Sequence, residues 1–156
     1  MNKKWISRYN SILTAGLAAL GFTSCDGLWN SPVEYGSPIV HYQVIGRVTD
    51  EAGSPIKGIK VTVADRYNYN GSADGKVDSV YTDEAGKYAS KQLRSMTIDE
   101  ICVVMADVDG DANGGTFAND TVKNKEIVRK QTKKGDGNWD NGTYELTADK
   151  KLKKTK

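Results

Sequence analysis

The sequence predicts an all-β protein, an antiparallel Greek-key β-sandwich preceded by a signal peptide and a flexible tether. Two observations lead to this prediction. Apolar and polar residues alternate in several short segments after residue 41, which is the pattern of half-buried strands. Turn-forming residues, including many of the 16 glycines, separate these segments, as they do in sandwiches. A chain of 156 residues has room for one such domain and a leader.

The first two strands show the clearest alternation. In the segment 42–50 the residues Tyr42, Val44 and Val48 fall on one face, and the segment 59–65 repeats the pattern. Gly and Pro residues between them indicate a turn. We expect further strands at 77–83, 86–90, 101–107, 121–128 and 143–148. The sandwich is therefore expected to span residues 42–149, followed by a basic tail at 150–156.

The N-terminal segment has the architecture of a signal peptide. Lys3, Lys4 and Arg8 precede an apolar run at 12–22. This run is shorter than the roughly 20 residues that a helix needs to cross a bilayer, so we expect residues 1–24 to be a lipoprotein signal peptide that is removed. Removal of its three basic residues changes the formal charge from +2 to −1. A charge so close to zero gives no indication of nucleic-acid binding.

Cys25 follows this leader directly. The sequence Phe22-Thr23-Ser24-Cys25 resembles the lipobox of bacterial lipoproteins, in which the cysteine receives diacylglycerol. The resemblance implies a protein that is held by palmitate or similar chains at the inner or outer membrane of a Gram-negative cell envelope. Residues 25–41 would then be the lipidated N-terminus and the tether. The alternative is a secreted protein with a disulfide between Cys25 and Cys102.

The two glycine-containing turns and their flanking strands resemble a known family, the carboxypeptidase regulatory-like domain. This family has a transthyretin-like fold, and in it the domain is a non-catalytic module. The resemblance therefore implies a β-sandwich with a structural or interaction role in the cell envelope. The matching residues are Gly46-Arg47-Val48, Asp50, Gly53, Pro55-Ile56, Gly58, Val61, Val63 and the run Thr82-Asp83-Glu84-Ala85-Gly86-Lys87-Tyr88.

Over its full length the chain also resembles the radical-SAM-associated lipoproteins of Gram-negative bacteria. The segments that carry this resemblance are KKWISRYNSIL, EYGSP, DVDGDANGG and NGTYEL. It implies a radical SAM enzyme as a neighbour, and hence that this chain is a possible substrate for modification. It does not imply a reaction for the chain itself. A protein or glycan partner in the cell envelope is also expected.

The stretch DVDGDANGGTFAND is the most acidic loop of the chain. Calcium-loop spacing fits if Asp109 is position 1, and the ligands would be Asp109, Asp111, Asn113, the Gly115 carbonyl and Asp120. The preceding segment ICVVMAD reads as a strand, whereas an EF-hand has a helix there. A Gly/Asn/Asp turn is the alternative, and Asp107 could add a ligand in a different arrangement.

Enzyme chemistry is not indicated by the sequence. His41 is the only histidine, and no nucleophile motif such as G-x-S-x-G occurs. One histidine and two cysteines also do not provide the usual ligands of a zinc site. The expectation is a membrane-anchored lipoprotein that is not an enzyme and has no certain cofactor, with calcium as the candidate. A calcium-stabilised binding module and a substrate of the radical SAM enzyme are the alternatives.

Overall fold

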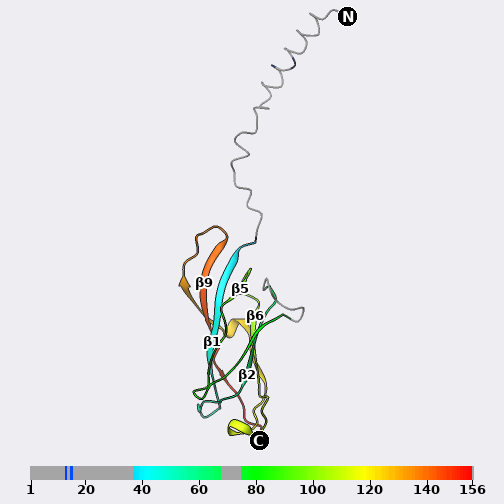
Figure 1. The fold of residues 1–156 in the computed structure, drawn as a ribbon, viewed down its shortest axis with the longest axis vertical. Coiled ribbons are helices and arrows are strands. Elements are labelled where there is room, and N and C mark those ends of the chain that lie inside the picture. Colours follow the sequence, from blue (N-terminus) through cyan, green and yellow to red (C-terminus); the bar gives the residue numbers. More distant parts are fainter. Residues whose placement is uncertain (1–12, 14, 16–36, 68–74, 156) are drawn as a thin grey trace, which may run out of the picture. The chain divides into compact units, whose positions relative to one another are not determined.

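The computed structural model describes residues 37–67 and 75–155, together with Leu13 and Ala15. The chain divides into two compact units, residues 1–35 and Gly36–Lys156. The second unit is an all-β sandwich of two sheets (Figure 1), which confirms the predicted fold class. Within the described residues no helix is long and apolar enough to cross a membrane.

The first sheet is built around β1 (Ile39–Thr49), the longest strand. β1 pairs antiparallel with β4 (Lys87–Ala89) and β5 (Leu93–Ser95), and parallel with β9 (Asp140–Thr147) and β10 (Lys150–Lys151). β8 (Val128–Lys133) pairs antiparallel with β9 at the edge of the sheet. The two parallel pairings join segments about 100 residues apart in the sequence, and they differ from the antiparallel arrangement that the sequence predicts.

The second sheet has the strand order β3-β2-β6-β7 and is antiparallel throughout. Its strands are β2 (Lys60–Asp65), β3 (Lys76–Tyr81), β6 (Ile101–Ala106) and β7 (Asp120–Val122). Two short 3₁₀ segments, η2 (Ala112–Gly114) and η3 (Asn124–Glu126), lie in the connections on either side of β7.

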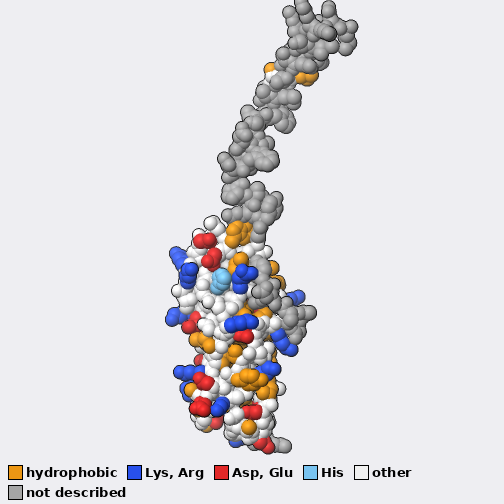
Figure 2. Space-filling model, viewed as in Figure 1, with side chains coloured by type: hydrophobic (Ala, Val, Ile, Leu, Met, Phe, Trp, Pro, Cys, Tyr) orange, Lys and Arg blue, Asp and Glu red, His pale blue; other side chains and the backbone are white. Residues whose placement is uncertain are grey.

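The core lies between the two sheets. Side chains along a strand point alternately to opposite faces, so the apolar set of each strand is buried on one side. β1 contributes Tyr42, Val44 and Val48, each fully buried, and β2 contributes Val61 and Val63. The polar or intermediate residues between them face outward, and Figure 2 shows basic and acidic side chains spread over the surface of the domain.

A buried carboxylate links the two sheets. Asp65 at the end of β2 is 1% exposed. Its Oδ2 accepts a hydrogen bond of 2.7 Å from the Tyr42 hydroxyl, and its Oδ1 accepts bonds from the Ser95 hydroxyl and the Tyr67 amide. Because every partner is a donor, the carboxylate is satisfied in the core.

Several strands differ from the prediction. In place of one strand at 121–128, β7 ends at Val122 and η3 follows it. β5 alternates but is only three residues long, too short to be recognised in a sequence, and all six side chains of β8 are exposed, so β8 shows no alternation at all. The last segment also belongs to the sandwich. β10 pairs with β1, Leu152 is fully buried, and Thr155 donates its amide to the Thr116 carbonyl.

Candidate functional sites

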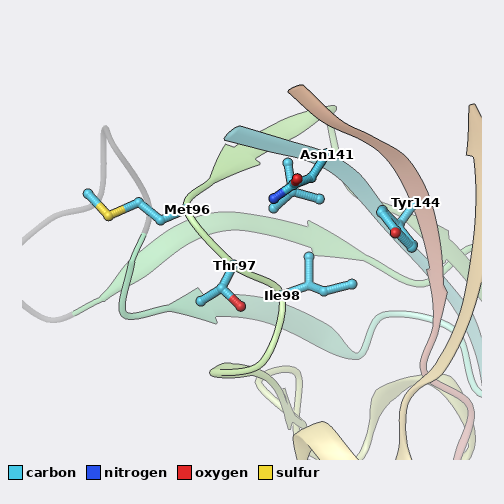
Figure 3. Close-up of a pocket in the computed structure, with 6 residues that line it drawn as sticks. Met96, Thr97, Ile98, Asn141 and Tyr144 are labelled. Atoms are coloured by element: carbon cyan, nitrogen blue, oxygen red, sulfur yellow. The ribbon is translucent and has the colours of Figure 1, made fainter. Parts of the chain in front are cut away.

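A pocket opens where β1 begins. It has a volume of about 210 Å³ and is lined by Val40, Met96, Thr97, Ile98, Asn141 and Tyr144. Figure 3 shows Asn141, Ile98 and Tyr144 around one space, with the Met96 side chain pointing away from it. These residues come from β1, β9 and the segment after β5, so the fold brings together three distant parts of the sequence.

The pocket combines apolar walls with polar groups. Val40 is buried, and Ile98 and Tyr144 are partly buried against the core. The Thr97 hydroxyl is already bonded to Asp99 at 3.0 Å. Among the described residues, no hydrogen-bond partner is found for the Tyr144 hydroxyl or the Asn141 side-chain amide. These two groups can therefore orient a small bound molecule.

Two residues of the pocket are neighbours of the buried Asp65 cluster. Val40 pairs in register with Ser95, whose hydroxyl bonds to Asp65, and Met96 follows Ser95 directly. The wall of the pocket is consequently held by a fixed polar network in the core. Sequence reasoning missed this site, because Val40 read as part of the tether and nothing local connects Ile98 with Tyr144.

The acidic loop brings together part of the predicted ligand set. The Asn113 side-chain amide donates to Oδ2 of Asp109, and both side chains lie against Gly58, which has a φ of +81°. Asp111 instead accepts a hydrogen bond of 2.9 Å from the Thr116 hydroxyl. Gly115 has a positive φ of 110°, as expected for a glycine at a sharp turn. Asp109 and Asn113 are therefore neighbours, as the calcium spacing requires.

Asp107 organises this loop, although it fell outside the predicted register. Its carboxylate accepts the backbone amides of Phe117 at 2.8 Å and Asp109 at 3.2 Å. Burial raises the pKa of Asp107, but these bonds, together with its contact with the Asp109 side chain, outweigh it and lower the pKa overall.

Asp120 is separated from the loop. It begins β7, and its Oδ2 lies 3.0 Å from the Nζ atom of Lys150. A carboxylate that pairs with a lysine ammonium is not directed at the ion that Asp109 and Asn113 would bind. Within the described residues no three His, Cys, Asp or Glu side chains form a group that could hold a metal ion.

Cys25 lies outside the described residues, so its lipidation stays a prediction. Cys102 lies on β6 with intermediate exposure and is a free thiol, and burial raises its pKa. The radical SAM enzyme, and the family resemblance that implies it, also stay predictions.

Neither a family model nor a curated protein matches the chain. Solved structures similar to it include dioxygenases. One is the 3-chlorocatechol 1,2-dioxygenase of Rhodococcus opacus 1CP, at 12% identity and a TM-score of 0.45, covering 80% of this chain and 62% of the enzyme. Another is the dioxygenase domain of a carbohydrate-binding fusion protein from Streptomyces sp. SirexAA-E, at 16% identity and a TM-score of 0.47, covering 79% and 86%. A mutant catechol 1,2-dioxygenase of Acinetobacter radioresistens has 16% identity and a TM-score of 0.46, covering 74% and 52%.

These similarities correct the functional expectation. The non-catalytic role was inferred from the module family that the sequence resembles. That inference is wrong, because sandwich structures similar to this one include catechol dioxygenases, so the architecture does not imply a non-catalytic module. The chain spans less than two thirds of the Rhodococcus enzyme, and identities of 12–16% concern the fold alone. Function therefore has to be argued from the sites of this chain.

Proposed function

We propose that the chain is a lipid-anchored cell-envelope protein that binds a neutral sugar unit of an envelope glycan in the Tyr144 pocket. The observation that carries the binding proposal is the combination of a partly buried aromatic ring with two hydrogen-bonding groups that have no described partner. An aromatic ring offers a face for the apolar side of a sugar ring. The Asn141 amide and the Tyr144 hydroxyl can each exchange hydrogen bonds with sugar hydroxyls.

The size and charge of the pocket support a small neutral ligand. Its volume of about 210 Å³ lies below the roughly 300 Å³ at which pockets for drug-sized molecules begin. None of the six lining side chains is charged. A charged ligand would lose its hydration there without gaining an opposite charge.

Binding can be tested with N-acetylglucosamine, which has hydroxyl groups, an amide and a methyl group. We expect a dissociation constant in the millimolar range, because the pocket makes few contacts. This corresponds to a binding free energy of about −4 kcal/mol. Chemical-shift changes should centre on the Asn141 side-chain amide. Tyr144→Ala should abolish them, while the control Tyr81→Ala, at a residue that is 58% exposed on the other sheet, should not. Shift changes that survive Tyr144→Ala would contradict the assignment.

The lipid anchor rests on Cys25 and is tested separately. Cys25→Ser should move the protein from the detergent phase to the aqueous phase, because the acyl chains would be lost. The matched control is Cys102→Ser, which leaves the lipobox-like sequence intact. If Cys25→Ser still partitions like the parent protein, the lipoprotein proposal is wrong.

Calcium remains a proposed ligand of the acidic loop, with a changed set of side chains. Asp109 and Asn113 are in contact, and Asp107 lies beside Asp109. All three offer hard oxygen donors, which calcium prefers. The structure supports Asp107 in place of Asp120, since Asp120 is paired with Lys150.

A further inference from the structure

A second pocket lies at the opposite end of β1, on the outer face of the first sheet. It has a volume of about 270 Å³ and is lined by Arg47, Thr49, Asp149, Lys150 and Lys151. Arg47 is exposed and is followed by the buried Val48, so its side chain points away from the core. Thr49 has the same orientation and pairs in register with Lys151.

Like charges face each other beside this pocket. Arg47 of β1 is the register partner of Lys87 of β4, and both are exposed. Two cations directly opposite each other on a sheet are destabilising. Lys151 of β10 adds a third cation, because it is the register partner of Thr49, two residues after Arg47. A bound anion would offset this repulsion.

Among the described residues, these cations lack the carboxylate partners that three other cations of the domain have. Lys57 pairs with Glu84, Arg129 with Asp99, and Lys150 with Asp120. By contrast, the Arg47 guanidinium bonds through Nε to the Ala85 carbonyl at 3.0 Å. No described residue forms an ion pair with its two terminal nitrogens, or with Nζ of Lys87 or Lys151.

One carboxylate also lines the pocket. Asp149 accepts the Arg47 backbone amide on Oδ1 at 2.8 Å, so the fold uses it to fix the start of β10 against β1. Because the Lys150 ammonium is paired with Asp120, the cations Arg47 and Lys151 line the pocket together with this one acidic group, so positive charge is in excess. Thr49 supplies a hydroxyl that can donate to an anion.

We propose that this pocket binds a phosphate group. The terminal nitrogens of Arg47 form a planar pair of donors that matches two phosphate oxygens, and Lys151 acts as a point charge. Lys87, directly opposite Arg47, adds to the field. The site is separate from the Tyr144 pocket in both residues and charge, so it does not depend on the proposed sugar binding.

The experiment titrates the full chain in non-ionic detergent with inorganic phosphate. We expect a saturable increase in melting temperature that weakens with added salt, because the ligand binds only the folded state through charge. Arg47→Gln and, separately, Lys151→Gln should each raise the dissociation constant about tenfold. Lys133→Gln, a matched control on the exposed strand β8, should leave it unchanged. Two substitutions are used so that a folding defect in one does not decide the result.

The source of the phosphate is distinguished by a second set of samples, in which micelles contain phosphatidylglycerol or phosphatidylcholine. Competition by phosphatidylglycerol micelles against inorganic phosphate would identify a lipid headgroup as the source. Phosphate binding without such competition would support a soluble phosphate compound. The proposal is overturned if phosphate has no effect on the parent, or if Lys133→Gln weakens binding as much as Arg47→Gln. Neither result depends on Cys25 or Tyr144.

Discussion

The Nζ atom of Lys150 lies 3.0 Å from Oδ2 of Asp120, and the Lys150 side chain is only 19% exposed. The same ammonium group lies 3.8 Å from Oε1 of Glu126 and 3.5 Å from the Thr121 carbonyl oxygen. Three oxygen atoms that could bind a metal cation therefore surround the ammonium group of Lys150 instead. This contact joins β10 to β7, and it explains why Asp120 is separated from the acidic loop.

We predict that calcium stabilises the protein through Asp107 and Asp109 and not through Asp120. With free calcium near ten times its dissociation constant, binding to the folded state adds about 1.4 kcal/mol, which raises the melting temperature by several degrees. Asp109→Ala should remove the increase, and Asp120→Ala should retain it because Lys150 already holds that carboxylate. The measurement is a melt in calcium against a melt in chelator. An identical melting temperature for the parent in both would leave only the turn interpretation.

Two carboxylates are predicted to make the fold sensitive to acid. The Thr121 amide and the Lys150 ammonium lower the pKa of Asp120, and the pKa of Asp107 is also lowered. Because the folded-state pKa is lowered, the unfolded chain binds protons first as the pH falls. The contribution of these two carboxylates to stability is therefore present above about pH 4 and is lost below it. Asp107→Asn with Asp120→Asn should be less stable near pH 7 but lose less stability between about pH 4 and pH 2. Equal losses in parent and double variant, measured by melts across this range, would contradict the prediction.

Removal of one hydroxyl from Tyr88 should weaken the sandwich. Tyr88 is buried, and its Oη donates a hydrogen bond of 2.6 Å to the Ala148 carbonyl. Burial and the charge of Asp149 raise the pKa of Tyr88, so the hydroxyl stays a donor. Tyr88→Phe leaves that carbonyl without this donor and should cost about 1–2 kcal/mol in urea unfolding. Tyr81→Phe, at an exposed position, should change stability by less than about 0.5 kcal/mol.

A larger loss is predicted at Gly46, which lies in register with Tyr88. A Cβ atom there would lie 2.4 Å from the Ala148 carbonyl oxygen and 2.7 Å from the Tyr88 hydroxyl. Gly46→Ala should therefore cost more than Tyr88→Phe, roughly 3 kcal/mol or more, because a backbone atom has to move. Comparison of the two urea midpoints tests this order, and a Gly46→Ala protein as stable as the parent would contradict it.

Residues Gly36–Lys156 should fold without the leader and the tether. All described strands and the whole core lie in this unit. A chain starting at Gly36 should show a β-type circular dichroism spectrum and a cooperative melt. A chain starting at Val44 should not, because it lacks Val40 and Tyr42 and the pairing of β1 with β5. A mainly helical spectrum, or equal melting temperatures for the two chains, would contradict this view of the domain.

The strands with one buried face were predictable from the sequence. In β2 each second residue is buried, and β1 follows the same rule except at Gly46, so the apolar pattern and the structure have the same period. β8 carries Arg129, Lys130 and Lys133 on a strand with no buried residue, so its sequence shows no apolar face. Its pairing with β9 is tertiary, and local composition does not record it.

The candidate sites were predictable only where a loop brings its own residues together. Asp109 and Asn113 are four residues apart in one turn, and their contact follows from the spacing. Tyr144 and Ile98 meet because β9 lies beside β1, which depends on the order of strands in the sheet. Arg47 and Lys151 are likewise joined only by the parallel pairing of β1 with β10.

The parallel pairing of β1 with β9 and β10 also has a consequence for when the protein can fold. β1 is among the first segments of the domain to be synthesised, but its partners are among the last. Contacts between such distant segments slow folding, because a long loop must close before they form. The first sheet is therefore incomplete until Leu152 has left the ribosome. If residues 1–24 act as the predicted leader, this delay would keep the polypeptide open during synthesis, and an open chain would pass across a membrane more readily than a closed core.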